Sequence, residues 1–299
     1  MNIEQLNAEF GIAGKLSFFE GKGGVTMARI EAAGGEALVS CQGGQVLLFK
    51  PAGAVEDVFF LSEKAHYGPT KAIKGGAPVC WPWFANDPEG RGRPNHGFVR
   101  NRPWDVRASE ALPDGRVRLS LGVVDTEDTR ALFAHAFDLE LEVTVGARID
   151  IGLITRNRSG EPMTITGALH SYYRVGDVRR IAVGGLEGVS FIDKTDGGKV
   201  KTQAGAITIA GETDRVFLDT SAPITIDDPA LGRKIVIEGS GSRSAVVWNP
   251  WIDVSTSMSD LEDDDYEVFV CVETANAGTD IVTIPPGGEH RLGMVVGLG

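Results

Sequence analysis

The chain alternates apolar and polar residues over many short segments, and this period of two is the feature that most limits its fold. In RVRLSLGVVD (residues 116–125) and FDLELEVTVG (137–146), apolar residues take almost every second position. Because successive side chains of a strand point to opposite faces of a sheet, such segments predict strands with one buried face. Further strands are predicted at residues 147–157, 206–211, 234–239, 244–249, 266–273, 280–286 and 291–298.

Helical patterns are few and short. They cover residues 3–10, 127–135 and 257–266, and no long amphipathic helices alternate with the strands as a parallel α/β sheet would require. The predicted strands are bounded by Gly, Pro, Asn or Asp, which favour turns. We therefore predict an all-β fold, a large and mostly antiparallel β-sandwich with few short helices, in a single domain that covers residues 1–299.

The charge balance narrows the choice of partner. The 29 basic and 41 acidic residues give a net charge of −12, which argues against duplex nucleic acid or an anionic membrane surface as partner. No apolar run approaches the roughly 20 residues of a membrane helix, and no signal peptide is visible. We expect a cytoplasmic monomer that binds a small molecule.

Positive charge is concentrated in one segment, residues 71–104. Six basic residues stand there against two acidic ones, a net charge of +4 in an acidic chain: Lys71, Lys74, Arg91, Arg93, Arg100 and Arg102 against Asp87 and Glu89. Residues 75–94 have the Gly and Pro content of a linker. The tryptophans and arginines of the segment indicate instead an ordered loop that packs on the sandwich.

Two strand patterns carry a side chain suited to acid–base chemistry. His170 shares its predicted face with Ala168 and Thr166, the more polar face of its strand. Glu273 shares a face with Cys271, and a carboxylate in line with an apolar face costs free energy unless something pairs with it. Each feature also has a purely structural explanation. His170 could be a hydrogen-bonded structural residue, and Glu273 could mark the point where its strand reaches solvent. The basic segment could be a loop held by salt bridges.

Metal and cofactor motifs are not apparent. The five histidines show no HxH or HExxH spacing, and the three cysteines show no CxxC spacing, so we expect no metal and no disulfide framework. The acidic run at residues 260–267 lacks the order of a calcium loop and fits a solvated loop or a helix start. We expect no cofactor.

Six blocks of uncommon residues follow one another between about residue 35 and the end of the chain. They are GGAPVCWPWF, PNHGFVRNRPW, ALHSYYRVGDVRRIAVGGLEG, ETDRV, VVWNPW and YEVFVCVETAN. In this order they resemble the glucose-6-phosphate 1-epimerase family (hexose-6-phosphate mutarotases), a branch of the galactose mutarotase-like class. The resemblance implies a β-supersandwich whose concave sheet binds a hexose phosphate.

The resemblance also implies the catalytic residues. The family's catalytic histidine corresponds to His170 and its catalytic glutamate to Glu273. Interconverting anomers requires removal of the O1 proton and delivery of a proton to the ring oxygen, followed by ring opening, rotation about C1–C2 and closure. We assign Glu273 as the base and His170 as the acid, and expect a protonated His170 and an ionised Glu273 in the resting protein.

Five further positions are expected to bind the substrate: Lys74, Asn95, His96, Arg100 and Asp214. Lys74 and Arg100 are the expected phosphate ligands, with Arg91 and Arg93 less favoured. Lys74 stands where the family usually has Arg in an Arg-Gly-Gly sequence. A lysine keeps the positive charge, but it cannot bind two phosphate oxygens through paired N–H groups as an arginine can. Asn95 stands where many members have Gln.

Three alternatives remain open. The aromatic residues Trp81, Trp83 and Phe84 are either platforms for the C–H faces of a sugar or anchors of the loop. The protein could bind a sugar phosphate without catalysis, although the presence of both His170 and Glu273 counts against this. It could act on unphosphorylated aldoses, although the basic segment counts against that.

Overall fold

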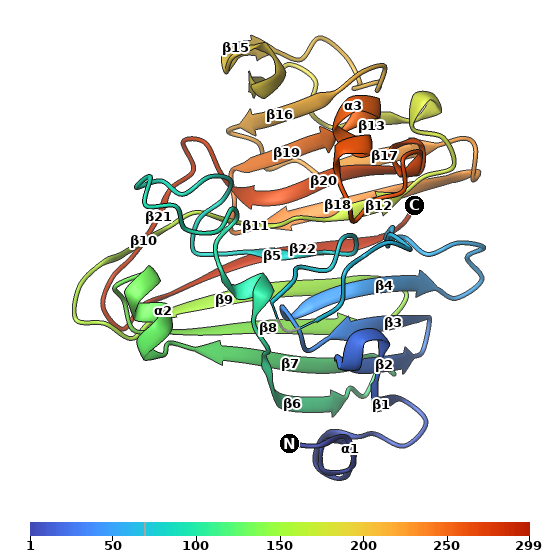
Figure 1. Ribbon diagram of the computed structural model, residues 1–299. Helices are drawn as coiled ribbons and strands as arrows, with labels where there is room; N and C mark the ends of the chain where they lie inside the picture. Colours follow the sequence, from blue (N-terminus) through green and yellow to red (C-terminus); the bar gives the residue numbers. More distant parts are fainter. Residues whose placement is uncertain (69) are drawn as a thin grey trace.

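The computed structural model describes residues 1–68 and 70–299 and consists mostly of antiparallel strands (Figure 1). The first sheet has the order β1-β2-β3-β4, and its strands are β1 (Leu16–Glu20), β2 (Thr26–Ala32), β3 (Gly35–Ser40) and β4 (Gln45–Pro51). A small two-stranded sheet pairs β10 (Met163–Ile165) with β21 (Val282–Ile284).

Two eight-stranded sheets make up the rest. The first has the order β15-β14-β16-β19-β20-β11-β5, with β12 also paired to β20: β5 (Val79–Cys80), β11 (Gly167–Leu169), β12 (Tyr172–Arg174), β14 (Ser190–Asp193), β15 (Lys199–Thr202), β16 (Thr213–Leu218), β19 (Ser244–Asn249) and β20 (Phe269–Asn276). The second has the order β13-β17-β18-β22-β9-β8-β7-β6: β6 (Asp105–Ala111), β7 (Val117–Val124), β8 (Phe137–Val145), β9 (Ile149–Asn157), β13 (Ala182–Gly184), β17 (Ile224–Asp228), β18 (Arg233–Ser240) and β22 (Glu289–Leu298).

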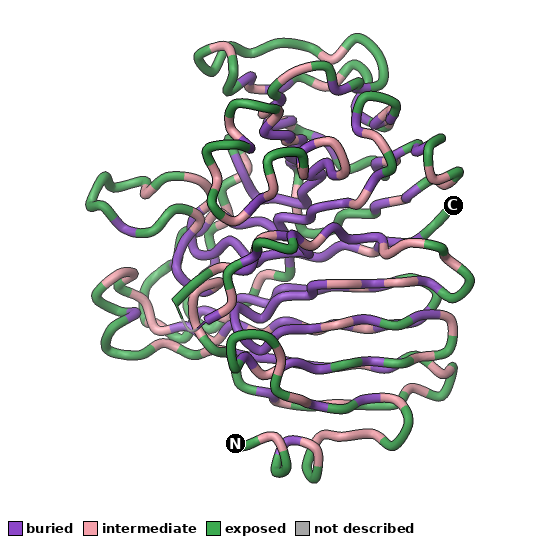
Figure 2. Tube along the Cα trace, turned by 45° about the vertical axis from the view of Figure 1, so that its right-hand side comes forward, coloured by how far each residue is buried: buried purple, intermediate pink, exposed green. Residues whose placement is uncertain are grey.

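The sheets form two layers with the main apolar cluster between them. A bridge between Val46 and Ala77 joins β4 to the segment before β5, so the four-stranded sheet continues the layer that contains β20 (Figure 1). Side chains of this layer, such as Val247 and Val272, share a buried cluster with side chains of the opposite sheet, such as Leu141. Figure 2 shows the buried residues along the middle of the strands and the exposed ones in the connections. The all-β sandwich predicted from the sequence is confirmed; the prediction of a single domain stays a prediction.

Most predicted strands are present. The patterns at 116–125, 137–146, 147–157, 234–239, 244–249 and 291–298 correspond to β7, β8, β9, β18, β19 and β22. The segment 266–273 begins with a 3₁₀ turn at Asp265–Val268, and β20 starts only at Phe269. Only three residues of 280–286 form β21. The strand predicted at 206–211 is wrong: Ile207 forms a single bridge with Val183, and Gly205 and Gly211 stand on either side of it.

Three α-helices are present among the described residues: α1 (Ile3–Phe10), α2 (Glu127–Leu132) and α3 (Trp251–Ser257). The first matches its prediction, and α2 ends three residues early. The helix predicted at 257–266 is wrong, because the carboxylate of Asp265 accepts the N–H of Glu262 and closes a turn there. In the described residues, no helix has both the length and the apolar character needed to span a membrane.

Candidate active site

A polar hollow of about 380 Å³ lies over the sheet that contains β20. Its lining combines residues of β12, β16, β19 and β20 with residues of the loops around β5, the turn after β14 and the segment after α3. The lining residues are Lys74, Phe84, Ala85, Asn86, Asn95, His96, Arg100, His170, Tyr172, Lys194, Asp214, Val246, Trp248, Met258 and Glu273. All seven residues predicted to form the site are among them.

Strand geometry brings His170 and Glu273 to the same side of the sheet. In β20, Val270 and Val272 belong to the core between the two layers, so Glu273 points to the other face. His170 follows β11 directly, and both β11 and β12 pair with β20. The backbone N–H of His170 donates to the carbonyl of Pro78 at 2.9 Å, which fixes the position of its main chain.

The two side chains meet in the hollow. Nε2 of His170 lies 3.6 Å from Oε1 of Glu273. Both are buried, at 8% and 1% exposure. Nδ1 of His170 and Oε2 of Glu273 have no hydrogen-bond partner among the described residues. A buried polar atom without a partner is costly, so these atoms are suited to contact a ligand.

Burial favours the neutral form of each group. It raises the pKa of Glu273 well above its usual range, and the negative charge of Asp214 adds to this while Arg100 opposes it. Burial also lowers the pKa of His170, and the neighbouring His96, Arg100 and Lys74 lower it further. Both shifts run against the expected imidazolium and carboxylate of the resting protein, since burial favours a neutral imidazole and a carboxylic acid.

His96 presents a defined tautomer. The backbone N–H of Ala85 donates to its Nδ1 at 3.2 Å, so a neutral ring carries its proton on Nε2. Burial lowers the pKa of His96 to about 3, with smaller contributions from Arg100 and Lys74, so the ring is neutral at pH 7. Its centroid lies 5.4 Å from that of His170. His96 can therefore offer an N–H donor beside His170.

Two glycines close to His96 and Lys74, Gly97 and Gly76, are required by close packing. Gly97 has φ +74°, and a Cβ there would overlap the carbonyl of Trp81. Gly76 has φ +63°, and a Cβ would overlap the carbonyl of Val46. These contacts hold the chain on either side of the site against the sandwich, next to His96 and Lys74.

Lys74 and Arg100 supply positive charge to the hollow. Nη2 of Arg100 donates to the carbonyl of Asn95 at 3.0 Å, and its Nε has no partner among the described residues. Nζ of Lys74 lies 3.5 Å from Oδ1 of Asp260. The structure thus places both cations in one hollow with His170.

Arg91 and Arg93 lie outside the hollow. Arg93 is paired with Asp87 and donates to the carbonyl of Leu132 at 2.7 Å. Its guanidinium lies 4.3 Å from the centroid of Trp83. Arg91 bonds to Glu89 and to a backbone carbonyl. Both arginines therefore fasten the loop, and neither lines the hollow that contains Lys74 and Arg100.

The aromatic residues of the loop divide between the two proposed roles. Trp81 and Trp83 are buried in the main core, so they anchor the loop. Phe84 lines the hollow, where its ring contacts that of His96. Of the three, only Phe84 can offer an apolar face to a ligand in this hollow.

Several lining residues were not predicted. Tyr172 stacks on His170, with centroids 5.0 Å and planes 10° apart, and the two-residue spacing on one strand face could have indicated it. Trp248 lies opposite Cys271 on the neighbouring strand. Burial raises the pKa of Asp214, and the charge of Lys194, in the 3₁₀ turn Lys194–Asp196, opposes this rise. No local pattern marks Lys194 as a site residue.

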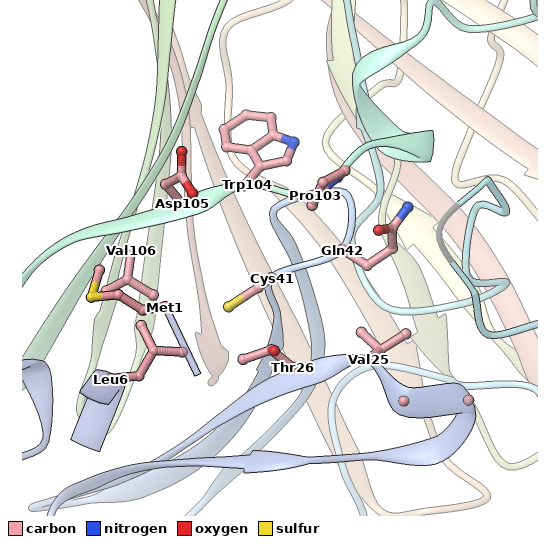
Figure 3. A pocket seen from close by; sticks show the side chains of 12 residues that line it. Met1, Leu6, Val25, Thr26, Cys41, Gln42, Pro103, Trp104, Asp105 and Val106 are labelled. Atoms are coloured by element: carbon pink, nitrogen blue, oxygen red, sulfur yellow. The ribbon is translucent and has the colours of Figure 1, made fainter. Parts of the chain in front are cut away.

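A second hollow of about 380 Å³ lies between α1, the start of β2 and the start of β6 (Figure 3). Its ionisable side chains are Cys41 and Asp105, and burial raises the pKa of the Cys41 thiol to about 12. It has no acid–base pair like that of His170 and Glu273. Among residues 1–68 and 70–299, no group of three His, Cys, Asp or Glu side chains is placed to bind a metal.

An antiparallel sandwich with this hollow over one sheet defines a protein of the galactose mutarotase-like fold. The chain matches the family described as Aldose 1-epimerase over residues 27–297, and it belongs to this family. A crystal structure described as a "putative mutarotase" from Salmonella typhimurium superposes with a TM-score of 0.90 at 32% identity, covering 99% of both chains.

Relatives with a more specific name cover most of the chain. A protein of Escherichia coli named "Putative glucose-6-phosphate 1-epimerase" is 40% identical over 243 residues, which is 81% of this chain and 80% of that protein. A protein of Cenchrus ciliaris with the same name is 34% identical over 258 residues, 83% of this chain and 77% of that protein.

Proposed function

We propose that this protein interconverts the α and β anomers of a hexose 6-phosphate by opening and closing the sugar ring. Membership of the aldose 1-epimerase family and the names of the relatives support this reaction. The observation that carries it is the 3.6 Å approach of His170 to Glu273 in a hollow that also contains Lys74 and Arg100.

One proton on the acid–base pair is enough for the whole cycle. Glu273 takes the proton of the O1 hydroxyl while His170 gives a proton to the ring oxygen, so that C1 becomes an aldehyde. After rotation about C1–C2, His170 takes back the proton of the former ring oxygen, and Glu273 returns its proton to O1. Because O1 and the ring oxygen are bonded to the same carbon, two side chains 3.6 Å apart can serve both.

The neutral pair that burial favours is compatible with these steps. A neutral imidazole with a carboxylic acid holds the same number of protons as an imidazolium with a carboxylate. A bound phosphate dianion would offset the charges of Lys74 and Arg100, which both lower the pKa of His170. Substrate binding would thereby favour the imidazolium form that delivers a proton to the ring oxygen.

The other residues orient the sugar. We assign the phosphate to Lys74 and Arg100, and hydroxyl groups to Asn95, Asp214 and the Nε2–H of His96. Binding energy from the phosphate is remote from C1 and can be used to align the reacting carbon with the acid–base pair. We further predict that the protein is a cytoplasmic monomer and that it requires no cofactor.

The test is a coupled assay that starts from pure α-glucose 6-phosphate and detects the β anomer. Its rate is compared with the spontaneous rate and with the rates for free glucose and free galactose. We expect acceleration of the phosphate ester well above that of either free sugar. Tight binding without acceleration would indicate a sugar-phosphate-binding protein, and faster reaction of a free sugar would indicate an aldose 1-epimerase for unphosphorylated substrates.

A further inference from the structure

Lys74, one of the two cations assigned to the phosphate, already has an acidic partner inside the protein. Its Nζ lies 3.5 Å from Oδ1 of Asp260 and 3.7 Å from Sδ of Met258. The side chains of Lys74 and Asp260 are 17% and 26% exposed, so water screens the pair only in part. Asp260 does not line the hollow itself, but its charge acts on a residue that does.

The position of Asp260 is fixed from both sides. Met258, two residues before it, lines the hollow. Leu261, directly after it, is 1% exposed and packs in a cluster with Tyr172 and Phe269. The chain between these anchors has little freedom to carry the Asp260 carboxylate away from Lys74.

Contacts between two loops hold the same segment in place. Ser62 donates to Asp265 at 2.9 Å, Lys64 pairs with Glu262 at 2.6 Å, and His66 contacts Ser259 at 3.3 Å. All three join the loop that leads to Lys74 to the segment that carries Asp260. The contacts of Lys74 with Asp260 and Met258 therefore belong to a larger set of contacts between the described residues of these two loops.

We propose that Asp260 is a specificity-determining residue that weakens the hold of Lys74 on the phosphate group. This inference rests on the proposed function. With Asp260 in place, the two cations and one carboxylate have a net charge of +1, and a phosphate dianion must compete with the carboxylate for Lys74. Because a lysine ammonium makes no bidentate fork with phosphate, it compensates less for this competition than an arginine would.

The consequence is a moderate preference for phosphorylated over free hexose. Repulsion between Asp260 and the ligand acts on the phosphate dianion and not on a neutral sugar. Removing the charge should therefore strengthen binding of the phosphate ester alone. Since neither His170 nor Glu273 contacts Asp260 in the structure, turnover at saturation should change little.

The experiment compares Asp260→Asn with wild type. We expect the KM for glucose 6-phosphate to fall about three- to tenfold, in keeping with the strength of partly exposed ion pairs, with kcat within about twofold and with free hexose unaffected. The Kd of 1,5-anhydroglucitol 6-phosphate, which lacks the anomeric hydroxyl and cannot react, should fall by the same factor in calorimetry. Asp263→Asn, an exposed residue of the same acidic run, is the matched control and should change neither value.

The double variant with Lys74→Met tests whether Asp260 affects phosphate binding through Lys74. If Asp260 acts through Lys74, then Asp260→Asn has no effect on KM in the Lys74→Met background. An unchanged or raised KM in the single variant, or an equal fall in both backgrounds, would overturn the inference. Failure of the wild type to bind the analogue and to accelerate anomerisation would instead refute the proposed function.

Discussion

Arg93 donates through Nε to Asp87 at 2.9 Å, and this pair closes the loop whose two ends form one wall of the hollow. Ala85 and Asn86 precede Asp87, while Asn95 and His96 follow Arg93. The carboxylate of Asp87 also accepts backbone N–H groups of Glu89, Arg91 and Arg93. The pair therefore sets the position of His96 without contacting the hollow.

Asp87→Asn should impair the phosphate ester and the free sugar alike. The variant loses the charge that holds Arg93, so the wall with His96 and Asn95 becomes less ordered. We expect kcat/KM to fall about five- to fiftyfold for both substrates, as misplacement of contacting groups typically causes. Measured kcat/KM values whose ratio stays constant support this account. A loss confined to the phosphate ester would show that the Asp87–Arg93 pair serves phosphate binding after all.

Arg100→Ala, in contrast to Asp87→Asn, should impair the reaction of the phosphate ester and leave that of the free sugar almost unchanged. Arg100 lines the hollow, and its Nε has no partner among the described residues. We expect the substitution to raise the KM for glucose 6-phosphate about tenfold or more, which is the usual effect of losing a charge-assisted contact. The KM for free glucose should change little. Arg102→Ala is the control, because Arg102 packs against Phe98 and does not line the hollow. Equal effects of Arg100→Ala on both sugars would contradict the phosphate assignment.

His96→Asn tests the neutral N–H donor beside His170. Asparagine tolerates the positive φ of this position, +61°, better than most residues, so the backbone should be retained. We expect kcat/KM to fall about tenfold for phosphorylated and free sugar. The pH profile of kcat/KM should keep its shape, since the pKa of His96 is about 3 and the ring does not titrate near neutrality. Loss of a limb of the profile would show that His96 itself transfers the proton.

Glu273 should make the protein less stable as the pH rises. Its pKa is near 4.3 in an unfolded chain and is raised by burial in the folded protein. Between these values the folded state retains a proton that the unfolded state has lost, so the free energy of unfolding falls with increasing pH, by at most about 1.4 kcal/mol per pH unit. The fall ends once the pH exceeds the pKa of the folded state.

Glu273→Gln removes this dependence. Above about pH 7 an unfolded histidine is neutral, as is buried His170. The buried thiols of Cys41, Cys80 and Cys271 add a slope of the same sign at alkaline pH, but variant and wild type share it, so the difference between the two proteins belongs to Glu273. Denaturant unfolding from pH 7 upward should show the variant to be more stable than wild type. Glu110→Gln, at an exposed position of β6, should follow wild type. A variant with the same stability as wild type at every pH would mean that Glu273 is ionised when folded.

The alternation of residues was sufficient to predict the sheet class and one essential feature of the site. Counting positions along each strand placed Glu273 on the same face as Cys271, and His170 on the same face as Ala168. Pairing of β11 and β12 with β20 joins residues about a hundred positions apart, and local patterns do not specify such partners. The meeting of His170 and Glu273 was therefore expected from the family resemblance rather than from periodicity.

Other features depend on long-range contacts that the sequence does not display. The burial of Trp81 and Trp83 follows from how the loop packs on the core, and both roles were compatible with their composition. Lys194 reaches the hollow because the turn after β14 lies beside it. Burial shifts the pKa values of His170 and Glu273 away from the charged forms expected for them, because removal from water disfavours the charge of each group.

The most direct test of the acid–base account is anomerisation of α-glucose 6-phosphate by Glu273→Gln and His170→Ala, measured by the coupled assay with near-ultraviolet circular dichroism as a check of folding. We predict that both variants fold and bind 1,5-anhydroglucitol 6-phosphate, and that neither accelerates the reaction above its spontaneous rate. Turnover close to that of wild type in either folded variant would contradict the assignment of this pair as the catalytic base and acid.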